Sequence, residues 1–224
     1  MSDTITLTAG HDGFQFTALH AQPEGPRKGG VIVIQEIFGL DRYVHEDVAR
    51  WAALGFEVIA PSMFDRQEKG FTAEHDPAGF ESGVKYAMAN GPDNAMGDLQ
   101  ACIDFLGQRG PVFMVGYCYG GTMTWLAASR CTGLSAGSSY YGSQVGGMAK
   151  FNLSCPVILH LGRKDGHIPA DEVKTAVEAA HPEIPVYIYE NSGHGFNNDG
   201  RPDSDLADAE LARERTLALF LANT

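Results

Sequence analysis

Short apolar runs alternate along the chain with longer amphipathic segments. Each run is four or five residues long, which suits a strand buried on both faces. The alternation predicts an α/β fold with a mostly parallel sheet flanked by helices on both faces. The predicted strands are Val31–Ile34, Glu57–Ala60, Val112–Val115, Ala136–Tyr140, Val157–Leu161 and Val186–Tyr189.

The chain ahead of the first run has a different pattern. Thr4–Thr8 and Phe14–Ala21 alternate between polar and apolar residues on either side of His11-Asp-Gly13. Such alternation across a turn predicts an antiparallel hairpin at the edge of the sheet.

Apolar residues that recur three and four positions apart predict the helices. One such stripe lies between Pro92 and Gly110-Pro111. We therefore expect the helix that carries it to begin at Pro92. Another helix is expected over Thr122 to Ser129. The remaining stripes are Val44, Val48 and Trp51, ended by Gly55; Met96, Leu99, Ile103 and Leu106, the stripe after Pro92; Val173, Ala176, Val177 and Ala180; and the segment Asp205 to Leu221.

The segment Phe64 to Gly83 fits neither the helical nor the strand period. It is mixed in polarity and contains Gly70, Pro77 and Gly79. A segment of this kind in an α/β enzyme either supports one wall of the active site or forms a plain surface loop. The chain shows no internal repeat or linker, and we expect a single α/β-hydrolase domain over residues 1–224.

Composition narrows the class of protein. Sixteen basic against 28 acidic residues give a formal charge of −12, which argues against nucleic acid or an anionic membrane as partner. No apolar run approaches the roughly 20 residues of a membrane helix, and Met1-Ser-Asp-Thr-Ile-Thr6 lacks the features of a signal peptide. The four cysteines form no Cys-x-x-Cys pair. We expect a cytoplasmic monomer that acts on a small molecule and has no bound metal.

The segment Gly116-Tyr-Cys118-Tyr-Gly-Gly121 carries the clearest chemistry. It joins a predicted strand to a predicted helix. A Gly-x-nucleophile-x-Gly turn at that junction exposes one side chain at the carboxyl edge of the sheet. The glycines allow strand and helix to approach closely. The residue at the corner is Cys118, where most such turns carry serine.

A nucleophile at this corner needs a base and a group that orients the base, in the chain order nucleophile, acid, histidine. Asp165 follows the strand Val157–Leu161, and His194 follows the strand Val186–Tyr189. Both therefore lie at the same sheet edge as Cys118. His167 is an alternative base, and Asp171 an alternative acid.

The segment Gln35-Glu-Ile-Phe-Gly39 directly follows the first parallel strand. In an α/β-hydrolase this loop supplies one N–H of the oxyanion hole, and the residue after the nucleophile supplies the other. The expected donors are the backbone amides of Ile37 and Tyr119. Glu36 is unusual here, because a negative charge opposes the developing oxyanion. It either rotates outward or has a specific role near the thiol.

These motifs together resemble the dienelactone hydrolase family. The resemblance spans nearly the whole chain and rests on five segments in order. They are Gln35-Glu-Ile-Phe-Gly39, Gly116-Tyr-Cys-Tyr-Gly-Gly121, Tyr140-Tyr-Gly142, Gly162-Arg-Lys-Asp165 and Gly193-His-Gly-Phe196.

The resemblance implies an α/β-hydrolase fold and a triad of Cys118, His194 and Asp165 that needs no metal or organic cofactor. It implies hydrolysis of an enol-lactone through a thioacyl-enzyme, with carboxymethylenebutenolide converted to maleylacetate. It also gives Glu36 a catalytic role: the carboxylate contacts the resting nucleophile, takes the thiol proton and swings away when substrate binds. A thiolate suits enol esters, because the enol departs as a stabilised enolate.

One part of the family pattern is missing. Members of the family are expected to hold the substrate carboxylate with two arginines, but the position after the catalytic histidine that should match is Asn198, and Phe71 to Gly97 contains no arginine. Arg66 and Arg201 are the remaining candidates for contact with the substrate carboxylate.

We expect Asn198, Tyr140 and Phe38 to contact substrate, with Tyr140 in the core or pocket wall. The alternatives are an esterase or thioesterase of the same fold acting on other activated esters or lactones. A non-catalytic thiol redox sensor or ligand-binding protein is the alternative from another class.

Overall fold

The computed structural model describes residues 2–224 and is built on one sheet of eight strands in the order β1-β2-β4-β3-β5-β6-β7-β8. All pairings from β4 to β8 are parallel, whereas β1 and β2 pair antiparallel with each other and β2 pairs antiparallel with β4. The strands are β1 (Asp3–Thr8), β2 (Gln15–Ala21), β3 (Gly30–Ile34), β4 (Glu57–Pro61), β5 (Val112–Tyr117), β6 (Ala136–Tyr140), β7 (Val157–Gly162) and β8 (Val186–Tyr189).

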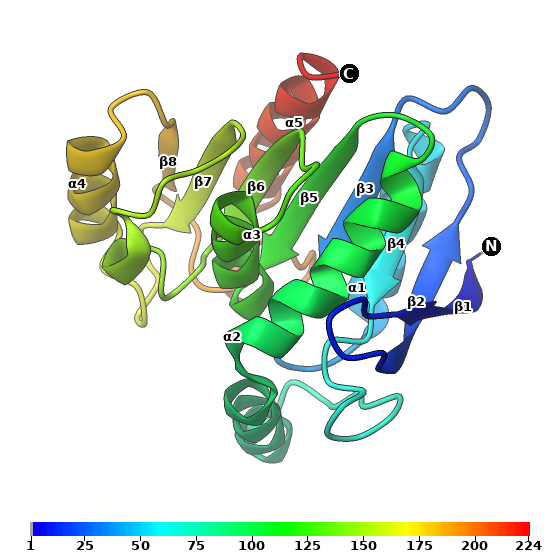
Figure 1. Cartoon of the computed structure of the whole chain (residues 1–224). Helices are drawn as coiled ribbons and strands as arrows, with labels where there is room; N and C mark the ends of the chain where they lie inside the picture. Colours follow the sequence, from blue (N-terminus) through cyan, green and yellow to red (C-terminus); the bar gives the residue numbers. More distant parts are fainter. Residues whose placement is uncertain (1) are drawn as a thin grey trace.

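Helices cover both faces of the sheet. Figure 1 shows α2 and α3 in front of the sheet and α1 and α5 behind it. On the rear face, Trp51 of α1 packs against Phe220 of α5 with ring centroids 5.2 Å apart. The helices are α1 (Arg42–Ala53), α2 (Pro77–Gly107), α3 (Tyr119–Arg130), α4 (Ala170–Ala180) and α5 (Leu206–Leu221), with a short 3₁₀ turn at Gly146–Met148.

The central strands explain why the apolar runs were continuous rather than alternating. Every residue of β3 through β7 is buried, because helices cover the sheet on both sides. The predicted strands, the edge hairpin and the α/β-hydrolase architecture are confirmed. No helix in residues 2–224 combines the length and the apolar character that a membrane crossing requires.

Helix α2 differs from the prediction. We expected it to begin at Pro92, yet it starts at Pro77, where Asp76 accepts a hydrogen bond from the N–H of Gly79. The helix is broken at Gly91, whose φ of 67° is not helical, and Pro92 opens the second half. Pro92 therefore marks a break inside α2, and the predicted start of the helix at Pro92 was wrong. Part of the segment Phe64 to Gly83 is the first turns of this helix.

Candidate active site

Cys118 lies at the turn between β5 and α3, in a strained conformation. Its φ of 53° and ψ of −108° are unusual for any residue with a side chain. Its backbone N–H donates to the carbonyl oxygen of Tyr140 on the neighbouring strand, at 3.0 Å. The strain is therefore held by the sheet, and the thiol is left partly exposed.

The glycines around Cys118 are needed because backbones meet closely there. A Cβ at Gly116 would lie 2.0 Å from the carbonyl oxygen of Gly120, and one at Gly120 would lie 2.3 Å from that of Ile34. Both distances are far below any normal contact. The sequence signal thus corresponds to a real steric requirement of the turn.

His194 is paired with a buried carboxylate. Its Nδ1 lies 2.7 Å from Oδ2 of Asp165, whose side chain is 1% exposed. Burial lowers the pKa of His194, but hydrogen bonds to Asp165 and Cys118 and the charges of both groups outweigh it and raise the pKa to about 10. Asp165 and His194 are therefore paired, and His194 and Cys118 line the same cavity at the carboxyl edge of the sheet.

Asp165 is itself held in place by its own loop. Its Oδ1 accepts hydrogen bonds from the backbone N–H groups of His167 at 2.8 Å and Ile168 at 3.1 Å. Burial raises the pKa of this carboxyl, yet the hydrogen bonds from His194 and the backbone lower it below its usual value. The other acid, Asp171, pairs with Arg163 at the surface, so it is not placed to orient His194.

A cavity of about 580 Å³ opens beside these groups. Its polar side includes Cys118, His194 and His167, whose ring centroid is 5.6 Å from that of His194. Its apolar side comes largely from α2. The residues that line it are Glu36, Ile37, Phe38, Phe80, Val84, Ala87, Met88, Cys118, Tyr119, Thr122, Met123, Ser143, Gln144, His167, His194, Arg201 and Asp203.

The backbone amides expected to form an oxyanion hole both belong to residues of this cavity. Within residues 2–224, neither the N–H of Ile37 nor that of Tyr119 has a hydrogen-bond acceptor. Residues 35–39, here called the oxyanion loop, are fixed by a hydrogen bond from Ala73 to the carbonyl of Phe38 and by a bridge between Gly39 and Thr72. Two unpaired donors are therefore held in a rigid loop and at a helix start.

Glu36 points to an arginine instead of the thiol. Its Oε2 lies 3.4 Å from Nη1 of Arg201, and its Oε1 has no hydrogen-bond partner in residues 2–224. Burial raises the pKa of this carboxyl, and the positive charges of Arg201 and His194 only partly oppose the rise. No hydrogen bond joins Glu36 to Cys118 among the described residues, which differs from the resting contact that the family resemblance implies.

Of the three residues expected to contact substrate, only Phe38 lines the cavity. Phe38 lines the cavity and stacks on His75 with ring centroids 3.8 Å apart. Tyr140 does not line it: the side chain is 1% exposed and its hydroxyl bonds to Thr216. Asn198 is also buried outside the cavity, with no partner for its Nδ2 in residues 2–224. Tyr140 and Asn198 are therefore not positioned to touch a ligand there.

Arg201, one of the two arginines that the sequence left as candidates for substrate contact, lines the cavity. It lies seven positions after His194, where the backbone of the loop returns toward the cavity. Arg66, the other open candidate, is held by Asp98 and Asp12 and does not line the cavity. The spacing after His194 did not predict that Arg201 lines the cavity, because the position of its side chain depends on the path of an irregular loop.

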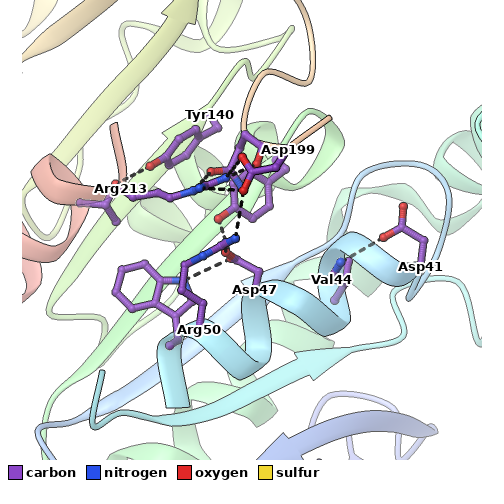
Figure 2. Close-up of polar contacts among 11 residues, drawn as sticks. Asp41, Val44, Asp47, Arg50, Tyr140, Asp199 and Arg213 are labelled. Atoms are coloured by element: carbon purple, nitrogen blue, oxygen red, sulfur yellow. Dashed lines mark hydrogen bonds and ion pairs between the residues drawn. The ribbon is translucent and has the colours of Figure 1, made fainter. Parts of the chain in front are cut away.

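Residues 190–205, here called the histidine loop, are tied to two helices by a partly buried polar network. Figure 2 shows Arg213 of α5 and Arg50 of α1 converging on Asp199 of this loop. Arg213 donates to both oxygens of Asp199, at 2.7 and 3.1 Å. Asp47 accepts from Arg50 and, at 2.6 Å, from the hydroxyl of Tyr117 on β5. The loop that carries His194 is thereby fixed to β5, the strand directly before Cys118.

The fold and the arrangement at its carboxyl edge define an α/β-hydrolase. In residues 2–224, no group of three or more His, Cys, Asp or Glu side chains is arranged to hold a metal ion. The model of the dienelactone hydrolase family matches residues 16–223, so the chain belongs to that family and is an ester-hydrolysing enzyme.

Individual relatives agree with this assignment. A carboxymethylenebutenolidase of Pseudomonas putida is 29% identical, covering 95% of this chain and 93% of that protein. A provisionally named carboxymethylenebutenolidase of Escherichia coli K12 is 30% identical, covering 93% of this chain and 83% of that protein. The crystal structure of a provisionally named dienelactone hydrolase from Klebsiella pneumoniae has a TM-score of 0.84 at 27% identity and covers 98% of each chain.

Proposed function

We propose that the chain cleaves enol-lactones and related activated esters through a thioacyl-enzyme formed on Cys118. The observation that carries this proposal is the pair of Asp165 and His194 in the cavity that also holds Cys118, with the cysteine at a strained turn. The names of the relatives, carboxymethylenebutenolidase among them, support an enol-lactone as substrate.

The reaction would begin with His194 in its imidazolium form, already holding the thiol proton of Cys118, in agreement with the raised pKa of His194. The thiolate attacks the ester carbonyl, and the negative charge that develops on its oxygen is stabilised by the N–H groups of Ile37 and Tyr119. Collapse of this intermediate breaks the bond between the carbonyl carbon and the leaving oxygen. The enolate leaves and takes the proton from His194.

Water completes the cycle. Neutral His194 removes a proton from a water molecule, whose oxygen attacks the thioester carbonyl. The bond between the carbonyl carbon and the sulfur breaks, the acid leaves, and Cys118 and the imidazolium form of His194 are restored. Asp165 keeps the imidazole in the tautomer that can accept a proton at its other nitrogen. A reducing cytoplasm would preserve the thiol between turnovers.

Glu36 remains in the proposed catalytic set. A carboxyl whose pKa is raised by burial can hold a proton near the thiol, and Arg201 offsets its charge when it is ionised. Both effects limit the negative charge beside the oxyanion position. Movement of the side chain between Arg201 and the thiol would give it the proton-accepting role that the family resemblance suggests.

The test is hydrolysis of p-nitrophenyl acetate by Cys118→Ala and by Cys155→Ala, a control at a part-buried cysteine that does not line the cavity. We expect the first to lose at least about 1,000-fold in kcat/KM and the second to match the parent. Mass spectrometry of the parent, quenched during turnover, should show one acyl group on the peptide containing Cys118. Turnover by Cys118→Ala at the parental rate would refute the proposal and favour a redox or ligand-binding role for the thiol.

A second candidate is an esterase or thioesterase that uses the same chemistry on other activated acyl groups. It is favoured by one specific observation, the apolar character of the cavity wall that α2 provides.

A further inference from the structure

The first half of helix α2 presents an apolar stripe to the catalytic cavity. Phe80, Val84, Ala87 and Met88 recur at helical spacing and all line it. Phe80 is 52% exposed and Met88 is 79% exposed, so neither side chain is explained by packing in the core. Single exposed apolar residues are common, but a stripe of four along one cavity indicates contact with an apolar ligand.

Two residues from other elements extend this apolar surface. Ile37 and Met123 line it, next to the reacting groups. The cavity volume of about 580 Å³ lies within the range of about 300–1,000 Å³ that is usual for small-molecule sites. There is thus room for an apolar group of several carbons beside a carbonyl at Cys118.

The first half of α2 offers no positive charge to an anionic substrate in the cavity. Arg201 is its one lysine or arginine in residues 2–224, and its guanidinium already faces Glu36. Glu36 and Asp203 both line the same space. Lys85, the one basic residue between Pro77 and Asn90, does not line it. A carboxylate placed along α2 would therefore be desolvated without a partner.

We infer that this cavity selects esters whose non-reacting part is apolar and uncharged, and that this part lies along Phe80, Val84 and Met88. The inference rests on the proposed function of Cys118, and it names the substrate class of that site. A neutral ester with an aliphatic chain of several carbons is then preferred over an ester of the same size that carries a carboxylate.

The first experiment compares p-nitrophenyl esters that share one leaving group. Each methylene added between acetate and hexanoate should raise kcat/KM by roughly three- to fourfold until the stripe is covered. Among acyl groups of similar size, the neutral pentanoate should exceed the anionic monosuccinate by at least about tenfold.

The second experiment moves a positive charge onto the stripe. In Phe80→Arg, the ratio of kcat/KM for pentanoate to that for monosuccinate should fall by at least about tenfold. Ala89→Arg places the same charge on an exposed position of the same helix that does not line the cavity, and its ratio should stay within about twofold of the parent. Both positions are exposed, so the fold should tolerate either change.

The outcomes separate this inference from the proposed function. Turnover that depends on Cys118 but is faster for monosuccinate than for pentanoate would overturn the apolar selection alone. Equal shifts in Phe80→Arg and Ala89→Arg would also overturn it, since the effect would then come from overall charge. A lack of Cys118-dependent turnover on every ester would overturn both.

Discussion

Arg201 Nη1 lies 3.4 Å from Glu36 Oε2, inside the cavity that also contains Cys118. This contact answers the question raised by an acidic residue in an oxyanion loop. The guanidinium offsets the charge of the carboxylate when it is ionised, and burial favours its neutral form. The carboxyl therefore adds little net negative charge beside the proposed oxyanion position.

Glu36→Gln should make the enzyme more stable at pH 8. The folded-state pKa of this carboxyl is raised, so the folded protein disfavours its ionised form and stability is lost as pH rises above about 4.5. The glutamine variant does not titrate. Urea unfolding should show a gain on the order of 1 kcal/mol at pH 8 that disappears near pH 4.

Glu81→Gln, on an exposed position of α2, is the control and should change stability little at either pH. If Glu36→Gln were less stable than the parent at pH 8, the pair with Arg201 would outweigh the effect of burial.

The pair of His194 and Asp165 should give the opposite pH dependence. The folded pKa of His194 is raised to about 10, so its stabilisation is complete below the unfolded value of 6.5 and is lost as pH rises through 10. His194→Gln should therefore be less stable than the parent by on the order of 2–4 kcal/mol at pH 6, with the gap closing by pH 10.

Urea unfolding at both pH values measures this gap. His45→Gln, on an exposed face of α1, should show no such convergence. A gap that stayed constant from pH 6 to pH 10 would mean that the imidazole is not charged in the folded enzyme at pH 6.

Gly116→Ala should disrupt the turn that carries Cys118. The new Cβ would lie 2.0 Å from the carbonyl oxygen of Gly120, which is a backbone atom that cannot rotate away. We expect a loss of about 3 kcal/mol or more in the free energy of unfolding. Gly147→Ala, where the Cβ meets nothing within 4 Å, should change it by less than about 0.5 kcal/mol. Thermal or urea unfolding measures both losses. Similar losses of stability in Gly116→Ala and Gly147→Ala would show that close packing is not the reason for glycine at position 116.

Arg213→Met should loosen the histidine loop. The change leaves Asp199 and Asn197 without the guanidinium that bonds them, at a position where Arg213 is largely buried. A loss of about 2–4 kcal/mol in the free energy of unfolding is expected, with faster amide exchange across residues 194–201.

Arg130→Met is the matched control, since Arg130 pairs at the surface with Asp93, which is 91% exposed. Its effect should stay within about 0.5 kcal/mol. Amide exchange in the histidine loop that was unchanged in Arg213→Met would show that the network stabilises the core without holding this loop.

The parallel strands and the order of the site motifs were readable from the sequence because both depend on local patterns. Continuous apolar runs mark strands buried on both faces, and a residue that directly follows such a strand must lie at its carboxyl end. That argument alone placed Cys118, Asp165 and His194 at one edge. The hydrogen bonds of these residues, and the position of Glu36 beside Arg201, could not be predicted from the sequence, because they depend on the three-dimensional paths of loops.

The first half of α2 was missed for a specific physical reason. Gly70, Pro77 and Gly79 suggested an irregular segment. A Cβ at Gly79, however, would lie 2.0 Å from the carbonyl oxygen of Glu74, and one at Gly83 would lie 2.1 Å from that of Ile37. The glycines serve close packing between backbones, which a single sequence does not reveal. The apolar stripe of Phe80 and Met88 faces a cavity, so it also escaped the usual pattern of a helix packed on the core.

The contact between Gly83 and Ile37 separates two tasks along one helix. The oxyanion loop rests on backbone at Gly83, so the side chains at Phe80 and Met88 can be exchanged without moving the donors that would carry the chemistry. New substrate preferences are therefore accessible by single substitutions on an exposed surface. For enzyme engineering, α2 is the place to diversify, and residues 35–39 are the place to leave alone.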